Sequence, residues 1–129
     1  MPTEISKHYA SQLQEWMDAI YFDLGLSTRL TDRLEEVIRR NTIVGIADKV
    51  EIHQSHLDEV ERKLSILEEK INQQKAAIAP NGIEVDDAVI DQPIRQMQSQ
   101  LGRKMKKVEN EFIRVKFECN SFLSEVFNA

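Results

Sequence analysis

The sequence contains little of what interrupts long helices or staples small domains. Only 4 Gly and 3 Pro occur among 129 residues, which argues against a sandwich or barrel with many turns. The single cysteine, Cys119, excludes an internal disulfide framework and fits a reducing compartment. No run approaches the roughly 18 consecutive apolar residues of a membrane span, and residues 1–8 lack the features of a signal peptide.

The chain also lacks an excess of basic charge. The net charge of -5 does not provide the basic surface that general nucleic-acid binding needs. We therefore expect a cytoplasmic protein that binds neither nucleic acid nor membrane. Catalytic motifs are absent as well, since the sequence has no Gly-rich phosphate loop and no Gly-x-Ser-x-Gly nucleophile motif. The protein is predicted not to be an enzyme and to need no cofactor.

What the sequence does contain is helical periodicity. From residue 43 to residue 78, apolar residues recur at alternating steps of three and four, the seam of a helix that packs lengthwise on other helices. Similar spacing predicts helices at 2–40, 43–79 and 93–127, within a single domain of residues 1–129. The segment 80–92 is predicted to be an acidic connector that packs as a loop. The predicted seam of the first helix is Ile5, Tyr9, Leu13, Trp16, Ile20, Leu24, Ser27, Thr31, Leu34 and Ile38.

A short connection at Asn41-Thr42 would make the first two helices antiparallel neighbours. The predicted fold is therefore all-α, a long three-helix antiparallel up-down-up bundle with coiled-coil-like packing. Aligning the seams places Leu57 level with Val115 and Leu34 near Val50. The third seam runs from Ile94 through Met97 and Leu101 to Val126.

Two polar layers interrupt the predicted core. One contains Thr31, His53 and Cys119, and the other contains Tyr9 and Gln74. Polar seam residues usually fix the register of packed helices. The alternative is a metal-binding or small-ligand-binding bundle that uses the His53/Cys119 layer, although two ligands are too few for a structural zinc site. No Asp or Glu falls in the predicted seams, so paired inward carboxylates are not expected.

Two other groups of residues invite functional interpretations. His56 is flanked by Asp58 and Glu59, which disfavours a phosphoryl acceptor, since such a site needs a neighbouring cation. The basic cluster at 103–107 has no interleaved aromatic residue. We expect its Lys104 and Lys106 to pair with Glu68 and Glu69 on the second helix.

The apolar faces of the first and third helices are wider than a narrow seam. This excess predicts a further partner, most simply a second copy of the chain in a homodimer. The predicted function is therefore that of an interaction, scaffold or adaptor module that acts through helix faces. The predicted partner-binding face consists of Met17, Tyr21, Leu26, Leu30, Ile113, Leu123 and Phe127.

The stretch Leu13-Gln-Glu-Trp16-Met17, followed by two further long helices, resembles the first helix of a spectrin-type three-helix repeat. The chain departs from that pattern because its third helix has no Trp and its first connection is shorter. The resemblance implies a three-helix architecture only.

Overall fold

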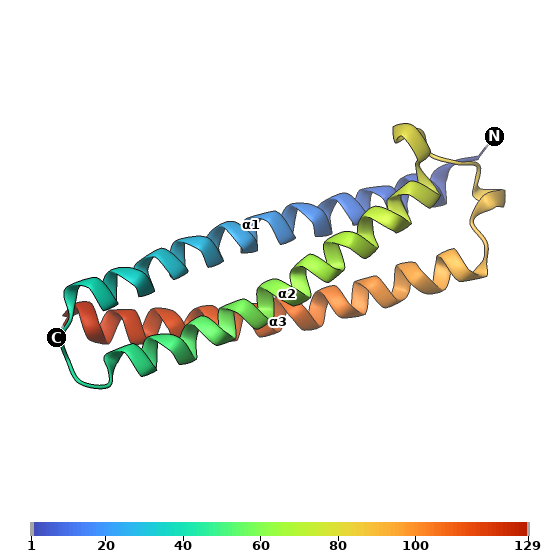
Figure 1. Ribbon diagram of the computed structural model, residues 1–129. Helices are drawn as coiled ribbons and strands as arrows, with labels where there is room; N and C mark the ends of the chain where they lie inside the picture. The colour runs from blue at the N-terminus through green and yellow to red at the C-terminus, as the bar shows by residue number, and fades with distance from the viewer. Residues whose placement is uncertain (1, 129) are drawn as a thin grey trace. The chain divides into compact units, whose positions relative to one another are not determined.

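The structure is a computed structural model that describes residues 2–128. It contains three long helices, α1 (Glu4–Arg40), α2 (Ile46–Ile78) and α3 (Gln92–Asn128), drawn in Figure 1. Two short 3-10 turns, η1 (Pro80–Gly82) and η2 (Asp87–Val89), lie between α2 and α3. The prediction of an all-helical fold with helices packed on one another is confirmed, and residues 2–128 contain no strand. None of the helices in this range has the length and apolar character needed to cross a membrane.

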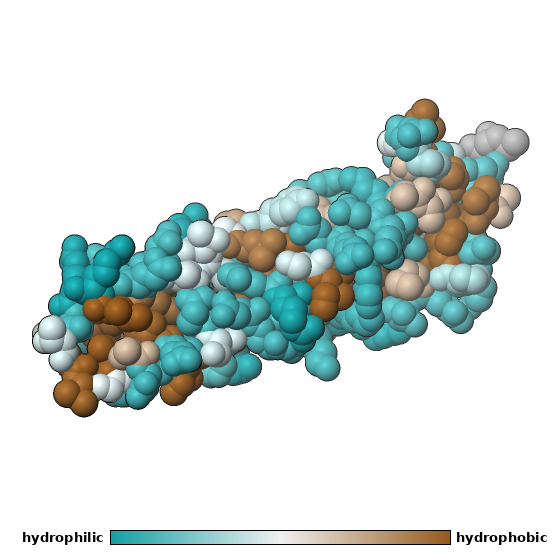
Figure 2. Space-filling view, viewed as in Figure 1, coloured by the Kyte–Doolittle hydropathy of each residue, from teal (hydrophilic) through white to brown (hydrophobic). Residues whose placement is uncertain are grey.

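The connection between α1 and α2 is longer than predicted. Helix α2 begins at Ile46 because Gly45 has a φ of 85°, a left-handed conformation that ends the connection before the first helical turn. Ile43 is 61% exposed and Val44 is 99% exposed, so the predicted start of the second seam lies outside the core. Figure 2 shows hydrophobic atoms on the surface at this connection.

The chain divides into two compact units. Unit 1 contains the residues through Tyr21 and Ser65–Lys107, and unit 2 contains Phe22–Leu64 and the residues from Val108 onward. Each unit has its own buried core made of segments from α1, α2 and α3. The prediction of one domain from 1 to 129 stays a prediction.

The core of unit 2 is one apolar cluster. As the aligned seams predicted, Leu57 and Val115 belong to this cluster, and so do Leu34 and Val50. Their burial on all three helices supplies the main favourable term for packing this unit. The cluster consists of Leu30, Leu34, Val37, Ile46, Val50, Leu57, Val115, Cys119, Phe122 and Leu123, with Val126 and Phe127 packed against it.

The core of unit 1 combines aliphatic residues with a buried amide network. Gln74 and Gln98 are 6% and 4% exposed. The Gln74 side-chain amide donates to the Ile94 carbonyl oxygen at 2.9 Å and to Gln98 Oε1 at 3.2 Å. The Gln98 amide in turn donates to the Tyr9 carbonyl oxygen at 3.2 Å and to Gln12 Oε1 at 3.0 Å. Gln98 therefore connects the two residues of the predicted layer, because it bonds both the Gln74 side chain and the backbone carbonyl of Tyr9.

The acidic connector packs as a loop on the beginning of α1, as predicted. Asp87 Oδ1 accepts hydrogen bonds from the backbone N–H groups of Ile5 (3.0 Å) and Ser6 (3.1 Å). The Ser6 hydroxyl donates to the Val85 carbonyl oxygen at 2.6 Å. Asp87 therefore supplies an acceptor for two of the first N–H groups of α1, which have no partner within the helix.

Candidate functional site

Some residues of the predicted partner-binding face are buried in the core. Met17, Leu30 and Leu123 are 5%, 6% and 1% exposed, so these three side chains are buried rather than free to contact a partner over most of their surface. They are covered because the helices of each unit pack over broad faces rather than along a narrow seam. The other members of the face are Tyr21 and Ile113, which are exposed, and Leu26 and Phe127, which are half-buried.

Two exposed aromatic residues in unit 2 were missed by the sequence reasoning. Phe22 is 64% exposed on α1, and Phe117 is 70% exposed on α3. The signal for Phe117 was present, because it follows Ile113 by four residues and therefore lies on the same side of the helix. Exposed aromatic residues of this size are uncommon outside binding surfaces when other apolar groups accompany them.

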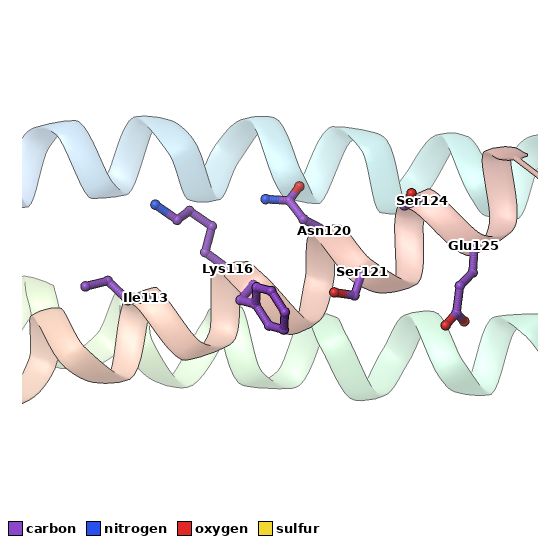
Figure 3. A pocket seen from close by; sticks show the side chains of 7 residues that line it. Ile113, Lys116, Asn120, Ser121, Ser124 and Glu125 are labelled. Carbon is purple, nitrogen blue, oxygen red and sulfur yellow. The ribbon is translucent and has the colours of Figure 1, made fainter.

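Phe117 and Ile113 belong to a surface of unit 2 that we name the α1/α3 face. It contains two shallow hollows, which share Lys116 and Asn120. Figure 3 shows that Lys116 and Asn120 extend from α3 toward α1, whereas Glu125 extends toward α2. The face is lined by Leu26, Arg29, Leu30 and Arg33 on α1 and by Ile113, Lys116, Phe117, Asn120, Ser121, Ser124 and Glu125 on α3.

The charge of the α1/α3 face is opposite to that of the whole chain. It carries three cations, Arg29, Arg33 and Lys116, against one carboxylate, Glu125. Within residues 2–128, none of the three cations has a carboxylate oxygen within 4.0 Å. Arg33 instead lies over the Phe127 ring at 5.4 Å, and Lys116 over the Phe112 ring at 5.9 Å. Lys116 also acts electrostatically on the Glu109 carboxyl group, whereas Arg29 and Arg33 have no carboxylate partner at this distance in residues 2–128.

Unit 2 also contains a buried pair of carboxyl groups, contrary to the expectation from the seams. Asp23 on α1 is 5% exposed and interacts with Glu109 on α3. Asp23 Oδ2 and Glu109 Oε1 are both buried without a hydrogen-bond partner. Burial, the contact with the Asp23 side chain and the Asp23 charge raise the pKa of Glu109 to about 8, partly offset by Lys116. Glu109 therefore retains its proton at neutral pH.

A second polar contact lies one helical turn from Asp23. The Ser27 hydroxyl, which is fully buried, donates to Glu61 Oε1 on α2 at 2.5 Å. Residues of all three helices thus place carboxyl groups in the interior of unit 2. None of them belongs to a group of three or more His, Cys, Asp or Glu side chains that could hold a metal ion, as far as the structure describes the chain.

The predicted layer of Thr31, His53 and Cys119 does not form a common polar cluster. Thr31 Oγ1 accepts a hydrogen bond from the Gln54 amide at 3.1 Å. The His53 ring stacks on Phe122 with centroids 4.7 Å apart, and burial lowers its pKa. Cys119 is fully buried in the apolar cluster, where burial raises its pKa to about 11. Such a thiol is neither a nucleophile nor a ready metal ligand.

The surroundings of His56 and of the basic cluster at 103–107 bear on two further predictions. The Nδ1 atom of His56 lies 4.0 Å from Glu118, an anion rather than the cation that a phosphoryl acceptor needs. Among the ion pairs of residues 2–128, none joins Lys104 or Lys106 to Glu68 or Glu69. Lys104 lies instead beside Lys70, whose charge and contact lower the Lys104 pKa. The predicted salt bridges were therefore wrong.

The chain matches no protein-family model, no curated protein and no solved structure.

Proposed function

We propose that the protein is a non-enzymatic interaction module that binds a helix of a partner protein on the α1/α3 face of unit 2. We further propose that its helices run in an up-down-up order. The observation that carries the function is the exposure of Phe117 (70%) and Ile113 (55%) on one side of α3. Helix-binding surfaces commonly offer such apolar anchors in a shallow groove between two helices.

The polar rim of the face supports this proposal. Asn120 and Ser121 beside Phe117 can donate to and accept from a partner, while Leu26 and Leu30 form the apolar floor. Interfaces that form and dissociate combine apolar anchors with a polar rim in this way. Reaction chemistry has weaker support, because neither Asp23 nor Glu109 lines these hollows.

The proposal is tested by titrating the full-length protein into fluorescently labelled amphipathic helical peptides of 18 residues. Three peptides share one leucine stripe and carry Glu, Gln or Lys on its flanks. At least one should bind, and Phe117→Ser should weaken that binding at least about tenfold. The matched control is Ile66→Ser, which alters an exposed apolar residue of unit 1. Failure of all three peptides to bind would contradict the proposal.

A second copy of the chain is the simplest partner for an apolar face, and the homodimer stays a prediction. Light scattering over a range of protein concentrations tests it directly, and Phe117→Ser tests whether this face is responsible. A dimer that Phe117→Ser dissociates would make a second copy the partner. We also propose a cytoplasmic location, supported by the unpaired thiol of Cys119.

A further inference from the structure

We propose that the occupant of the α1/α3 face is an amphipathic helix with acidic flanks, supplied by a different protein. The inference rests on the proposed function and names the chemistry of the partner. It is carried by the convergence of Arg29, Arg33 and Lys116 beside exposed apolar groups.

The three cations approach the face from two helices. Arg29 and Arg33 are one turn apart on α1, and both line the hollow that Lys116 of α3 also lines. Like most Lys and Arg side chains among the residues that the structure describes, these three have no carboxylate oxygen within 4.0 Å. What distinguishes them is that they converge beside exposed apolar groups, on a face where Glu125 is the one lining carboxylate. Unpaired cations beside apolar anchors are complementary to carboxylates that flank an apolar stripe.

The charge also argues against a second copy of the chain. A two-fold interface brings the same surface patch of both copies together. On this face it would oppose the three cations of one copy to the three of the other, with only Glu125 as compensation on each side. Like charges brought together in an interface are strongly disfavoured. A different protein with acidic residues meets no such repulsion.

The size of the face fits a short helix. The lining residues of α3 run from Ile113 to Glu125, a rise of about 18 Å at 1.5 Å per residue. A bound helix of about three to four turns would cover this length. Its apolar residues would contact Phe117 and Ile113, and its acidic residues would face Arg29, Arg33 and Lys116.

The test compares the Glu, Gln and Lys peptides on the full-length protein. We expect the Glu peptide to bind at least about tenfold more tightly than the Gln peptide, and the Lys peptide not to bind. The preference should shrink as salt rises. The double variant Arg29→Glu/Arg33→Glu should lose at least about tenfold in affinity for the Glu peptide. Its matched control, Arg103→Glu/Lys106→Glu, reverses two exposed charges of unit 1 and should change affinity less than about twofold.

The outcomes separate this inference from the proposed function. Equal binding of the Glu and Gln peptides would overturn the acidic partner while leaving helix binding in place. Absence of all binding would overturn both. Vesicles of phosphatidylserine and phosphatidylcholine serve as the competing anionic surface, since cations and aromatic side chains also suit a membrane. Vesicle binding without peptide binding, lost in Arg29→Glu/Arg33→Glu, would overturn the protein partner.

Discussion

Asp87 caps helix α1 from 81 residues further along the chain, where its carboxylate accepts a hydrogen bond from the backbone N–H of Ser6 at 3.1 Å. The same oxygen accepts a second bond from Ile5. The first N–H groups of a helix have no partner within the helix, and a carboxylate near them is favoured by the helix dipole. The acidic connector therefore has a structural role at the start of α1.

We expect Asp87→Ala to lower the free energy of unfolding by about 1 kcal/mol, the usual cost of losing an N-cap. Urea unfolding followed by circular dichroism measures this change. Glu84→Ala is the control, because it removes a neighbouring acidic side chain that accepts no hydrogen bond from the described residues of α1. Equal unfolding midpoints for the two variants would contradict the capping role.

The Asp23–Glu109 pair makes stability depend on pH. The pKa of Glu109 is raised to about 8 in the folded protein, so folding retains a proton that the unfolded chain releases above its ordinary pKa of about 4.3. The contribution of Glu109 to the free energy of unfolding is therefore greatest below that ordinary pKa and falls as the pH rises toward 8. The charged groups around the pair are Lys116 on α3, which opposes the shift, and Glu61 on α2, which bonds Ser27.

Glu109→Gln should remove most of this pH dependence, because the amide can donate to Asp23 without ionising. We expect the free energy of unfolding of the variant, relative to that of the wild type, to increase from pH 5.5 to pH 8.5. Urea midpoints at both pH values measure the gain, and Glu125→Gln on the same helix should leave the slope unchanged. Parallel curves for the wild type and Glu109→Gln would show that the pair does not hold the proton.

Two glycines inside helices should respond differently to alanine. Gly25 is exposed in α1, and a Cβ there would meet no atom within 4 Å. Gly25→Ala should therefore stabilise the protein by about 1 kcal/mol. At Gly102 a Cβ would lie 3.3 Å from the Trp16 ring, so Gly102→Ala should gain less or lose stability. A larger gain at Gly102 than at Gly25 in thermal unfolding would contradict this packing.

The buried amide network of unit 1 gives a further prediction. Gln98→Ala removes the bond that the Gln74 amide donates to Gln98 and the bonds that Gln98 donates to the Tyr9 carbonyl and to Gln12, which should cost about 2 kcal/mol. Gln96→Ala, on the exposed side of α3, should be nearly neutral. Urea unfolding compares the two variants, and equal stability would mean that water replaces Gln98 in the network.

The period of apolar residues was enough to predict the helices and most of the α2 seam, from Val50 to Ile78. The prediction failed where a polar residue occupies the buried position. On α1 the seam was drawn through Leu24, but the structure buries Asp23. On α3 it was drawn through Met97, which is 37% exposed, while Gln98 is buried. The burial of a polar side chain depends on the residues that neighbouring helices pack against it, and those residues are not visible in local spacing.

The candidate site was less predictable than the fold. Leu26, Leu30 and Ile113 belong to both the predicted face and the α1/α3 face, because wide apolar stripes reveal excess surface. Phe117 was missed since it lies outside the seam. The cations of the face could not be assigned from sequence either, because whether Arg29 finds a carboxylate depends on the neighbouring helices.

The central claim is that the α1/α3 face of unit 2 is a binding surface. Its most direct test is a ¹H–¹⁵N NMR titration of the full-length protein with the Glu-flanked peptide. The account predicts saturable shift changes at residues 26–33 and 113–125. Changes confined to other residues, or none at concentrations where the peptide is in excess, would contradict it.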